Sequence, residues 1–476
     1  MKVEIKNLEN ELVKAKAFVM NDIENVMNLS LHDDELNYVK ETYDVNKDDI
    51  IVINRYTELY IIFVVNGDDD CEKLECCRKN GALICNMLNA KKLEEVVLMN
   101  EGVEKNEFLA TVEGMMLCNY EFKKYKSEPK YNTFKTIYLK DGVDDRSLRL
   151  LEVVVDATCW ARDLVNEPVN KLNAEELAEC VSGRFRDAGG RAEVLNRKKI
   201  ESLKMGGLLA VNAGSVDEPT FTILEWNPDN KVNEKPIVLV GKGIVFDTGG
   251  YNLKPTAYMN DMKDDMSGAA TVAAVLFAVA KSKLPLHIVG LIPATDNRID
   301  GNAHVSGDII TMFDGTTVEV VNTDAEGRLI LADALSYAKK YDPMLVMDFA
   351  TLTGAASYAI GPVATVVMEN DASDSYNEME KIGEEVNERL VKFPLWKEYG
   401  KLVKSDIADL KNSGGKYAGM ITAGKFLQHF TDYPWIHFDI AGTAFIENPE
   451  PYRGPGATGI HVRLLMHYFD KLIKTF

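Results

Sequence analysis

The chain has 476 residues, of which 46% are hydrophobic and 27% are charged. This length exceeds that of one ordinary domain and the composition excludes a disordered chain, so we expect a globular protein with two domains. The formal net charge of −20 argues against nucleic acid and anionic membranes as partners, because their phosphate groups repel an acidic surface.

Residues 1–145 alternate short apolar runs with polar stretches of helical character, which predicts a small N-terminal α/β domain. The apolar runs are Ile50–Ile53, Leu59–Val65 and Val96–Met99, and the helical stretch Cys71–Leu93 precedes the last of them. We find no catalytic constellation in this part. The N-terminus lacks the apolar core of a signal peptide and no apolar run is long enough to span a bilayer, so we expect a cytoplasmic protein.

A linker helix is expected at residues 146–169. The pair Asp141-Gly142 and the charged residues after it mark a domain boundary, and Leu148–Leu164 has the periodicity of an amphipathic helix. This pattern stops at Asn166-Glu167-Pro168.

Residues 170–476 are expected to form a larger C-terminal α/β catalytic domain, in which a mixed, mainly parallel central sheet is covered by helices. Its apolar runs are continuous rather than alternating, and helical segments such as Ala269–Lys281 and Ala332–Lys339 separate several of them, as in sheets buried on both faces. In such sheets the active site lies beyond the carboxyl ends of the strands. The expected strands are Phe221–Leu224, Ile237–Val240, His287–Ile292, Val318–Val321, Met344–Met347, Ala364–Met368 and Trp435–Ile440.

Several common catalytic motifs are absent or incomplete. The sequence contains neither the HExxH helix of zinc proteases nor the GxSxG turn of serine hydrolases. Gly241-Lys242-Gly243 begins like a dinucleotide-binding loop, but Phe246 stands where the third glycine belongs. Gly419–Lys425 matches a phosphate-binding loop except that Phe426 replaces the Ser or Thr that would hold magnesium.

Three segments of the second domain place carboxylates or lysines beside glycines at expected strand ends: Val240–Pro255, Met262–Ala270 and Val321–Leu335. Glycine allows the backbone to approach a ligand closely, and buried charges are costly unless they are paired or bound to metal. Carboxylates without histidine make an oxygen-rich site suited to Mn, Mg or Zn. The alternative is a set of surface loops on an α/β sheet.

Taken together, these segments closely resemble the leucyl aminopeptidases, also called cytosol aminopeptidases. NTDAEGRL at Asn322–Leu329 is the signature of that family. The resemblance covers nearly all of the chain after about residue 150, and it continues through DFATLTGA (Asp348–Ala355), SDIADLKN (Ser405–Asn412) and PWIHFDIAGTA (Pro434–Ala444).

The resemblance implies which residues form the active site. Asp247 and Glu326 would bridge two metal ions. Lys242 and Asp265 would complete the tighter metal site, and Asp324 would complete the more exchangeable one. Lys254 and Arg328 would be catalytic without binding metal, and Arg328 would hold a bicarbonate ion that shuttles the proton. Because lysine binds metal only as a neutral amine, the dications must strongly depress the pKa of Lys242.

The substrate contacts that the resemblance implies are small or apolar, which suits Leu-like or Met-like side chains, although packing in the core would also explain them. They are Met262, Asn322, Thr351, Leu352, Gly354, Ala441 and Ala444. Ala444 is expected to widen the pocket. Ser306 stands where the family usually has proline, in a loop where we expect it to change rigidity rather than chemistry.

The implied function is a metal-dependent aminopeptidase that hydrolyses the N-terminal peptide bond of peptides, prefers Leu-like or other apolar first residues, and uses a metal-bridging hydroxide. The implied cofactors are two divalent ions per subunit, Zn or Mn with Mg or Co as alternatives, and bicarbonate. The implied assembly is a homohexamer. The competing interpretations are a catalytically inactive or DNA-binding member of the same fold, and a dipeptidase or Cys-Gly hydrolase with the same chemistry.

Overall fold

The computed structural model describes residues 3–7, 13–47, 50–140 and 143–476. The chain divides into two compact units. The first comprises Met1–Asp156, Glu385–Asn387 and Asn448–Gly454, and the second comprises Ala157–Glu384, Glu388–Glu447 and Pro455–Phe476. Helix α4 (Asp145–Asn166) carries the chain from the first unit into the second. Asp141 and Gly142, which we expect to mark the boundary, lie outside the described residues, and the domain limits drawn from the sequence stay a prediction.

The first unit is built on a six-stranded sheet with the order β1-β6-β5-β2-β4-β3. Neighbouring strands are parallel except for β3 and β4, which are antiparallel. The strands are β1 (Glu4–Asn7), β2 (Ala15–Met20), β3 (Ile51–Asn54), β4 (Leu59–Val64), β5 (Glu95–Glu101) and β6 (Thr136–Leu139). The helices of this unit include α1 (Asp33–Val45), α2 (Asp70–Ala90) and α3 (Lys105–Cys118). Helices α2 and α3 pack closely because Gly114 has no side chain: a Cβ atom there would lie 2.1 Å from the carbonyl oxygen of Arg78.

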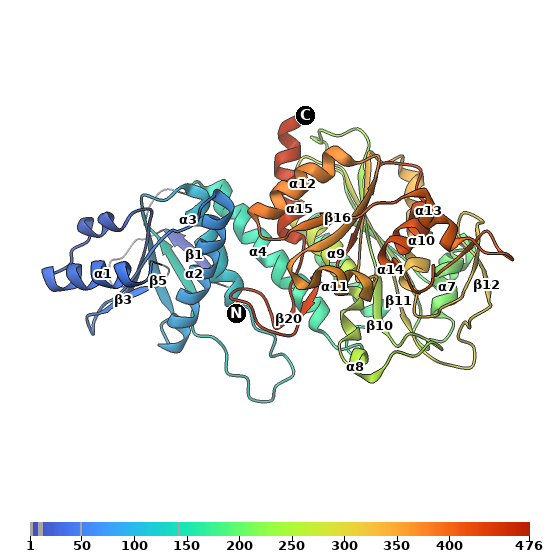
Figure 1. Ribbon diagram of the computed structural model, residues 1–476, viewed down its shortest axis with the longest axis horizontal. Helices are drawn as coiled ribbons and strands as arrows, with labels where there is room; N and C mark the ends of the chain where they lie inside the picture. The colour runs from blue at the N-terminus through green and yellow to red at the C-terminus, as the bar shows by residue number, and fades with distance from the viewer. Residues whose placement is uncertain (1–2, 8–12, 48–49, 141–142) are drawn as a thin grey trace. The chain divides into compact units, whose positions relative to one another are not determined.

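The second unit contains a nine-stranded sheet with the order β16-β15-β18-β14-β9-β11-β8-β7, and β10 also pairs with β11 (Figure 1). Five strand pairs are parallel and three are antiparallel, which confirms the mixed, mainly parallel sheet predicted from the sequence. The strands are β7 (Arg191–Leu195), β8 (Thr220–Trp226), β9 (Ile237–Gly241), β10 (Gly243–Asp247), β11 (Ile288–Asn297), β14 (Leu345–Ala350), β15 (Thr365–Asn370), β16 (Leu390–Lys392) and β18 (Trp435–Asp439).

Helices cover both faces of the central sheet. Helices α9 (Ser267–Lys281) and α10 (Gly327–Ala338) both contact β9, β11 and β14, and they lie on opposite sides of the sheet in Figure 1. The two faces use alternate residues of β11. Gly290 faces Val272 and Leu276 of α9, whereas its neighbour Leu291 belongs to the apolar core that α10 helps to form. The central strands are therefore buried on both sides, as their continuous apolar sequences predict.

Two elements differ from the expectations. The run Val318–Val321 contributes not to the central sheet but to β13 (Thr317–Glu319) of a separate three-stranded sheet, between β12 (Ile309–Thr311) and β17 (Leu410–Lys411). A short buried apolar strand has the same pattern in either sheet, so periodicity cannot assign it. Helix α10 begins at Gly327, five residues before the expected start, inside the NTDAEGRL motif. No helix among the described residues is both long and apolar enough to cross a membrane.

Asp333 joins three segments of the second unit. Its side chain is fully buried on α10 and accepts hydrogen bonds from the backbone N–H groups of Leu208 and Phe313, both at 2.9 Å. Leu208 lies on α7 (Gly206–Asn212), so one carboxylate fixes this helix and the Phe313 loop against α10.

Asp333→Ala should lower the free energy of unfolding of the second unit by about 3 kcal/mol, because each buried N–H group left without a partner costs roughly 1–3 kcal/mol. All four tryptophans lie in the second unit, so their fluorescence during urea denaturation reports on it. Asp187→Ala, an exposed position at the end of α5 (Ala174–Asp187), is the control and should change stability by less than about 0.5 kcal/mol. Equal stability of the two variants would contradict the role of Asp333.

Candidate active site

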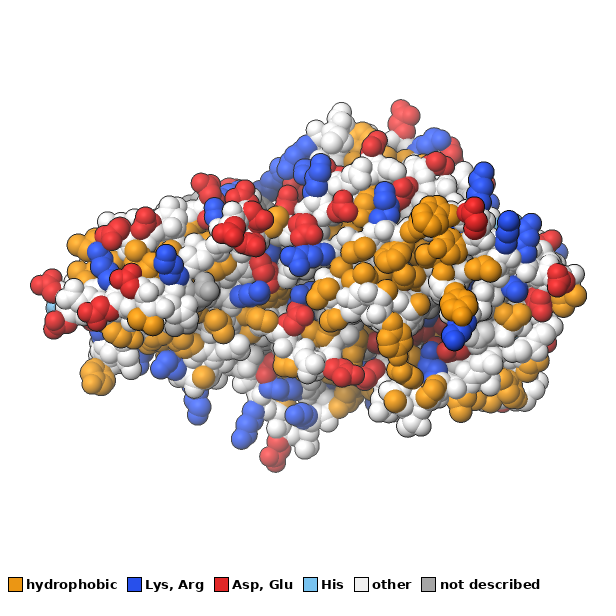
Figure 2. Space-filling model, viewed as in Figure 1, with side chains coloured by type: hydrophobic (Ala, Val, Ile, Leu, Met, Phe, Trp, Pro, Cys, Tyr) orange, Lys and Arg blue, Asp and Glu red, His pale blue; other side chains and the backbone are white. Residues whose placement is uncertain are grey.

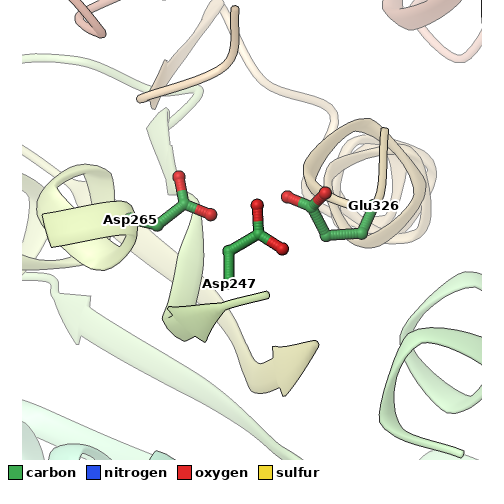
Figure 3. Close-up of side chains that lie close together, drawn as sticks. All are labelled: Asp247, Asp265 and Glu326. Atoms are coloured by element: carbon green, nitrogen blue, oxygen red, sulfur yellow. The ribbon is translucent and has the colours of Figure 1, made fainter. Parts of the chain in front are cut away.

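Three buried carboxylates meet beyond the carboxyl ends of the central strands. Asp247 ends β10, Asp265 lies in the 3-10 helix η2 (Met262–Met266) that leads into α9, and Glu326 directly precedes α10. One oxygen from each side chain lies within 4.8 Å of the others. Figure 3 shows Asp247 between the other two, with the carboxylates pointing toward one another. Segments about 80 residues apart in sequence thus converge on one point, because parallel strands bring their ends to the same edge.

Lys242 lies against this cluster of acids. It follows β9 directly, and its Nζ is 2.7 Å from Oδ1 of Asp265 and 2.9 Å from Oε1 of Glu326. The same nitrogen donates a hydrogen bond to the carbonyl oxygen of Thr351 at 3.0 Å. The side chain is only 3% exposed. Its path depends on Gly327, since a Cβ atom there would lie 2.3 Å from Cε of Lys242.

Lys254 joins a fourth carboxylate to the cluster. Its Nζ is 2.7 Å from Oδ2 of Asp247 and 2.6 Å from Oδ1 of Asp324. The Asp324 side chain is 32% exposed, whereas that of Asp247 is 3% exposed, so Asp324 marks the solvent side of the site. Gly249 leaves space for this carboxylate: it has a φ of +84°, and a Cβ atom there would lie 2.9 Å from Oδ1 of Asp324.

The burial of these charges shifts their pKa values. Burial raises the pKa of Asp265 well above its usual range, although Lys242 opposes the shift. Burial and the neighbouring Asp247 and Glu326 raise the pKa of Asp324 to about 6. Burial also disfavours the charge of Glu326, but Lys242 and Lys254 outweigh it and lower its pKa to about 2. Four carboxylates thus face only two lysine ammonium groups, an arrangement that favours the binding of further cations.

The oxygen atoms fit divalent metal ions. Oδ2 of Asp265 and Oε2 of Glu326 are buried and have no hydrogen-bond partner among the described residues. Asp247 is oriented by its other oxygen, Oδ1, which accepts hydrogen bonds at 2.8 Å from the backbone N–H of Gly249 and from Nδ2 of Asn297. Oxygen-rich, histidine-free sites of this kind suit Mn, Mg or Zn.

Arg328 lies in the first turn of α10 and is 7% exposed. Its Nη1 donates a hydrogen bond to the carbonyl oxygen of Asn412 at 2.7 Å, while its buried Nε has no hydrogen-bond partner among the described residues. Burial lowers the pKa of the guanidinium to about 10, so it remains a cation at neutral pH and cannot act as a base. A buried cationic donor without a partner fits a small bound anion.

Three buried residues that our sequence analysis did not single out hold the site loops. Asn297 of β11 donates from Nδ2 to Asp247 and also to the carbonyl oxygen of Thr323, at 3.1 Å. Asn412 accepts from the backbone N–H of Val321 at 2.9 Å and donates to the carbonyl oxygen of Asn322 at 2.7 Å. Asn412 ends the SDIADLKN motif, which was the available signal for it, whereas Asn297 lies in no motif that we identified.

The third of these residues is Asp439, which holds two segments of the predicted substrate pocket. Its Oδ1 accepts from the backbone N–H of Leu352 at 3.1 Å and from that of Ala441 at 3.3 Å. Thr353 donates its hydroxyl to Oδ2 at 2.6 Å. One buried carboxylate at the end of β18 therefore fixes the loop after β14 beside the loop after β18.

The other predicted substrate contacts occupy different environments. Thr351 touches the acid cluster directly, because its hydroxyl donates to Oδ1 of Asp265 at 2.8 Å. Asn322 is held in the signature loop and accepts from the backbone N–H of Asp324 at 2.9 Å. Met262 begins η2, and Gly354 begins α11 (Gly354–Ile360). Ala444 is 2% exposed and therefore buried, and its place in the pocket stays a prediction.

Comparison with known proteins shows the family. The model of the cytosol aminopeptidase family, catalytic domain, matches residues 159–466. A probable cytosol aminopeptidase from Clostridium perfringens is 38% identical over 454 residues, covering 92% of this chain and 90% of that protein. Another probable cytosol aminopeptidase, from Geobacter sulfurreducens, is 43% identical over 387 residues, which cover 80% of this chain and 78% of that protein.

Solved structures agree with this result. The bottromycin maturation enzyme BotP in complex with Mn superposes with a TM-score of 0.86 at 27% identity, covering 97% of this chain and 100% of that chain. A mutant of tomato leucine aminopeptidase has a TM-score of 0.86 at 25% identity, and the match covers 99% of this chain and 97% of that chain. The chain therefore belongs to the cytosol aminopeptidase family, as the motifs predict, and is a hydrolase with the metal-dependent aminopeptidase activity of that family.

Gly327→Ala should weaken metal binding without removing a ligand, because the added methyl group must displace Lys242. Changes to residues that orient metal ligands typically cost about 10–100-fold in affinity, and we expect a loss in that range. Titration with Mn after chelation, followed by calorimetry, measures it.

Gly183→Ala is the matched control, since a Cβ atom at Gly183 in α5 would meet nothing within 4 Å. If the Gly327→Ala variant binds Mn as tightly as the wild type, Lys242 does not need the space that the absent side chain of Gly327 leaves.

Proposed function

We propose that this protein removes the N-terminal residue of peptides, with a preference for Leu-like or other apolar first residues, at a site that holds two divalent ions. The main support is the convergence of Asp247, Asp265 and Glu326 within 4.8 Å, beside the buried Lys242. A cluster with this excess of buried carboxylate is costly to fold unless cations bind to it.

Five residues would hold the two ions. Asp247 and Glu326 would be shared between both ions, Lys242 and Asp265 would complete one site, and the more exposed Asp324 would complete the other. When bound, two such ions would supply a hydroxide nucleophile near neutral pH. Zn and Mn are the proposed ions, with Mg and Co as alternatives, and the Mn complex of BotP supports a divalent metal. The free amino group of a peptide is a metal ligand, which explains the proposed restriction to N-termini.

Lys254 is proposed to stabilise the negative charge that develops on the scissile carbonyl oxygen. Its ammonium group contacts two of the proposed ligands, Asp247 and Asp324, and this places a positive charge at the solvent side of the cluster. A fixed cation at that position stabilises the oxyanion more than the ground-state carbonyl, which is how it raises kcat rather than binding.

Arg328 is proposed to hold a bicarbonate ion through the donors that protein groups do not use. The unpartnered Nε supports this role, while the bond from Nη1 to the carbonyl oxygen of Asn412 fixes the guanidinium. The competing role is structural, with Arg328 serving only to hold the backbone near Asn412.

The proposed first-residue pocket is mostly small or apolar, in keeping with an apolar side chain. Its residues are Met262, Asn322, Thr351, Leu352, Gly354, Ala441 and Ala444. A homohexamer is the proposed assembly, and light scattering that finds an active monomer at micromolar concentration would contradict it. The inactive and DNA-binding alternatives are less well supported. All seven proposed metal-binding and catalytic residues are present, and the net charge of −20 opposes phosphate contacts.

Asp265→Ala and Lys254→Ala should separate metal binding from catalysis. Asp265→Ala removes a charged ligand and should lower the metal content after dialysis, measured by mass spectrometry. Lys254→Ala should keep the ions and lower kcat on Leu-amide by about 10²–10³-fold, the usual effect of removing one oxyanion donor. Lys199→Ala, on the exposed side of α6 (Arg197–Leu203), is the control and should behave as wild type. Wild-type kcat in Lys254→Ala would refute the proposed role.

Arg328→Ala distinguishes the bicarbonate role from the structural one. If Arg328 anchors the ion, the variant should keep its metals and thermal stability while kcat falls by about 10²–10⁴-fold or less, the range of general-base assistance. The wild type should lose part of its activity in carbonate-depleted buffer and regain it with bicarbonate, and the variant should respond weakly. A loss of thermal stability, with both proteins insensitive to bicarbonate between about pH 7 and 9, would establish the structural role instead.

A further inference from the structure

Two exposed tyrosines from segments 100 residues apart meet at the surface of the second unit. The hydroxyl of Tyr258, on α8 (Thr256–Met259), lies 2.8 Å from the hydroxyl of Tyr358, on α11. The two residues are 56% and 79% exposed. A hydrogen bond between exposed hydroxyls adds little to stability, because water competes for both groups. Stabilisation of the fold therefore does not account well for this contact.

Tyr358 lies beside a residue of the proposed first-residue pocket, and Tyr258 reaches it through the hydroxyl contact. Cε2 of Tyr358 is 3.9 Å from the position that a Cβ atom on Gly354 would occupy, so its ring stands beside this pocket residue. Tyr258 lies four positions after Lys254 and four before Met262. The hydroxyl contact therefore links the middle of the segment between Lys254 and Met262 to the helix that Gly354 begins.

Figure 1 shows α8 and α11 on the same part of the second unit, and Figure 2 shows hydrophobic side chains gathered over α11, α13 (Lys397–Gly400) and α14 (Gly419–Gln428). A tyrosine ring offers a rigid apolar wall and keeps a polar group at its tip. The hydroxyl contact places the two rings side by side and favours one relative orientation of them, so the wall that they form includes both.

We propose that Tyr258 and Tyr358 form the outer wall of the first-residue pocket and favour long apolar first side chains, such as Met and Leu, over Ala. This inference rests on the proposed aminopeptidase function and adds two specificity-determining residues to it. The wall contacts the far end of a long side chain, which Ala does not reach, so its effect falls on KM for long first residues. The hydroxyl contact aligns the rings, and breaking it from either side has the same consequence.

The test compares Tyr258→Phe, Tyr358→Phe, the double Phe variant and Tyr358→Ala on Met-amide and Ala-amide, with kcat and KM measured separately. Each Phe variant should raise KM for Met-amide by about three- to fivefold, and the double variant should show the same rise rather than the product of the two. Tyr358→Ala should raise KM about tenfold, the low end of the effect of one or two methylene contacts in a pocket. For Ala-amide, KM should stay within about twofold of the wild-type value, and kcat should hold for both substrates.

Tyr38→Ala, an exposed tyrosine of α1 in the first unit, is the matched control and should leave both substrates unaffected. Equal changes in KM for the two amides, multiplicative effects of the two Phe substitutions, or no change in any variant would each overturn the proposal. These outcomes require a wild-type enzyme that cleaves both amides. A wild-type protein that cleaves neither would refute the proposed function itself, so the two failures are distinguishable.

Discussion

The second unit is organised around charge that is buried beyond the ends of its central strands. Four carboxylates, from Asp247, Asp265, Asp324 and Glu326, face the two ammonium groups of Lys242 and Lys254. Removing such groups from water is costly, and two lysines cannot neutralise four acids. Burial, with the neighbouring Glu326 and Asp247, raises the pKa of Asp265 although Lys242 opposes the shift. Divalent ions bound at the proposed site would offset this excess of negative charge, so metal binding would stabilise the folded second unit.

Such a site works only if the surrounding backbone leaves space for it and satisfies its own polar groups. Gly327 provides the space for Lys242, and Gly249 provides it for Asp324. The loops themselves are fixed by buried amides and acids, of which Asn412 and Asp439 are the main examples. These residues bind backbone groups and, for Asp439, the hydroxyl of Thr353, and they do not contact the acid cluster. They hold the loops that carry the acids in one geometry, which limits how far the carboxylates can move apart to relieve their repulsion.

The sequence predicted those features of the second unit that depend on residues close together in the chain, namely strands and short motifs. Continuous apolar runs marked most of the central strands, and the acidic motif around Asp247 marked a strand end, whereas Asp265 lies in the 3-10 helix η2 and not at the end of a strand. It did not predict the contacts that join distant segments. Asn412 binds backbone groups 90 or 91 positions away, and Asn297 reaches Asp247 over 50 positions. No periodicity encodes such pairs, because each partner is an ordinary polar residue until the fold brings the two together.

The same reasoning separates the inner part of the site from its rim. In the inner part, Lys242 binds two carboxylates and a carbonyl oxygen, and its side chain packs against Gly327. Any substitution of Lys242 therefore disturbs several contacts at once. At the rim, Tyr258 and Tyr358 are exposed and share a single hydroxyl contact, so either can change without unsettling the acids. The inner residues that serve the chemistry cannot be substituted one at a time without disturbing their neighbours. The rim residues that shape the substrate pocket can be substituted singly. Differences in substrate choice between enzymes of this kind should therefore arise at the rim, where a changed side chain alters recognition and leaves the metal ligands in place.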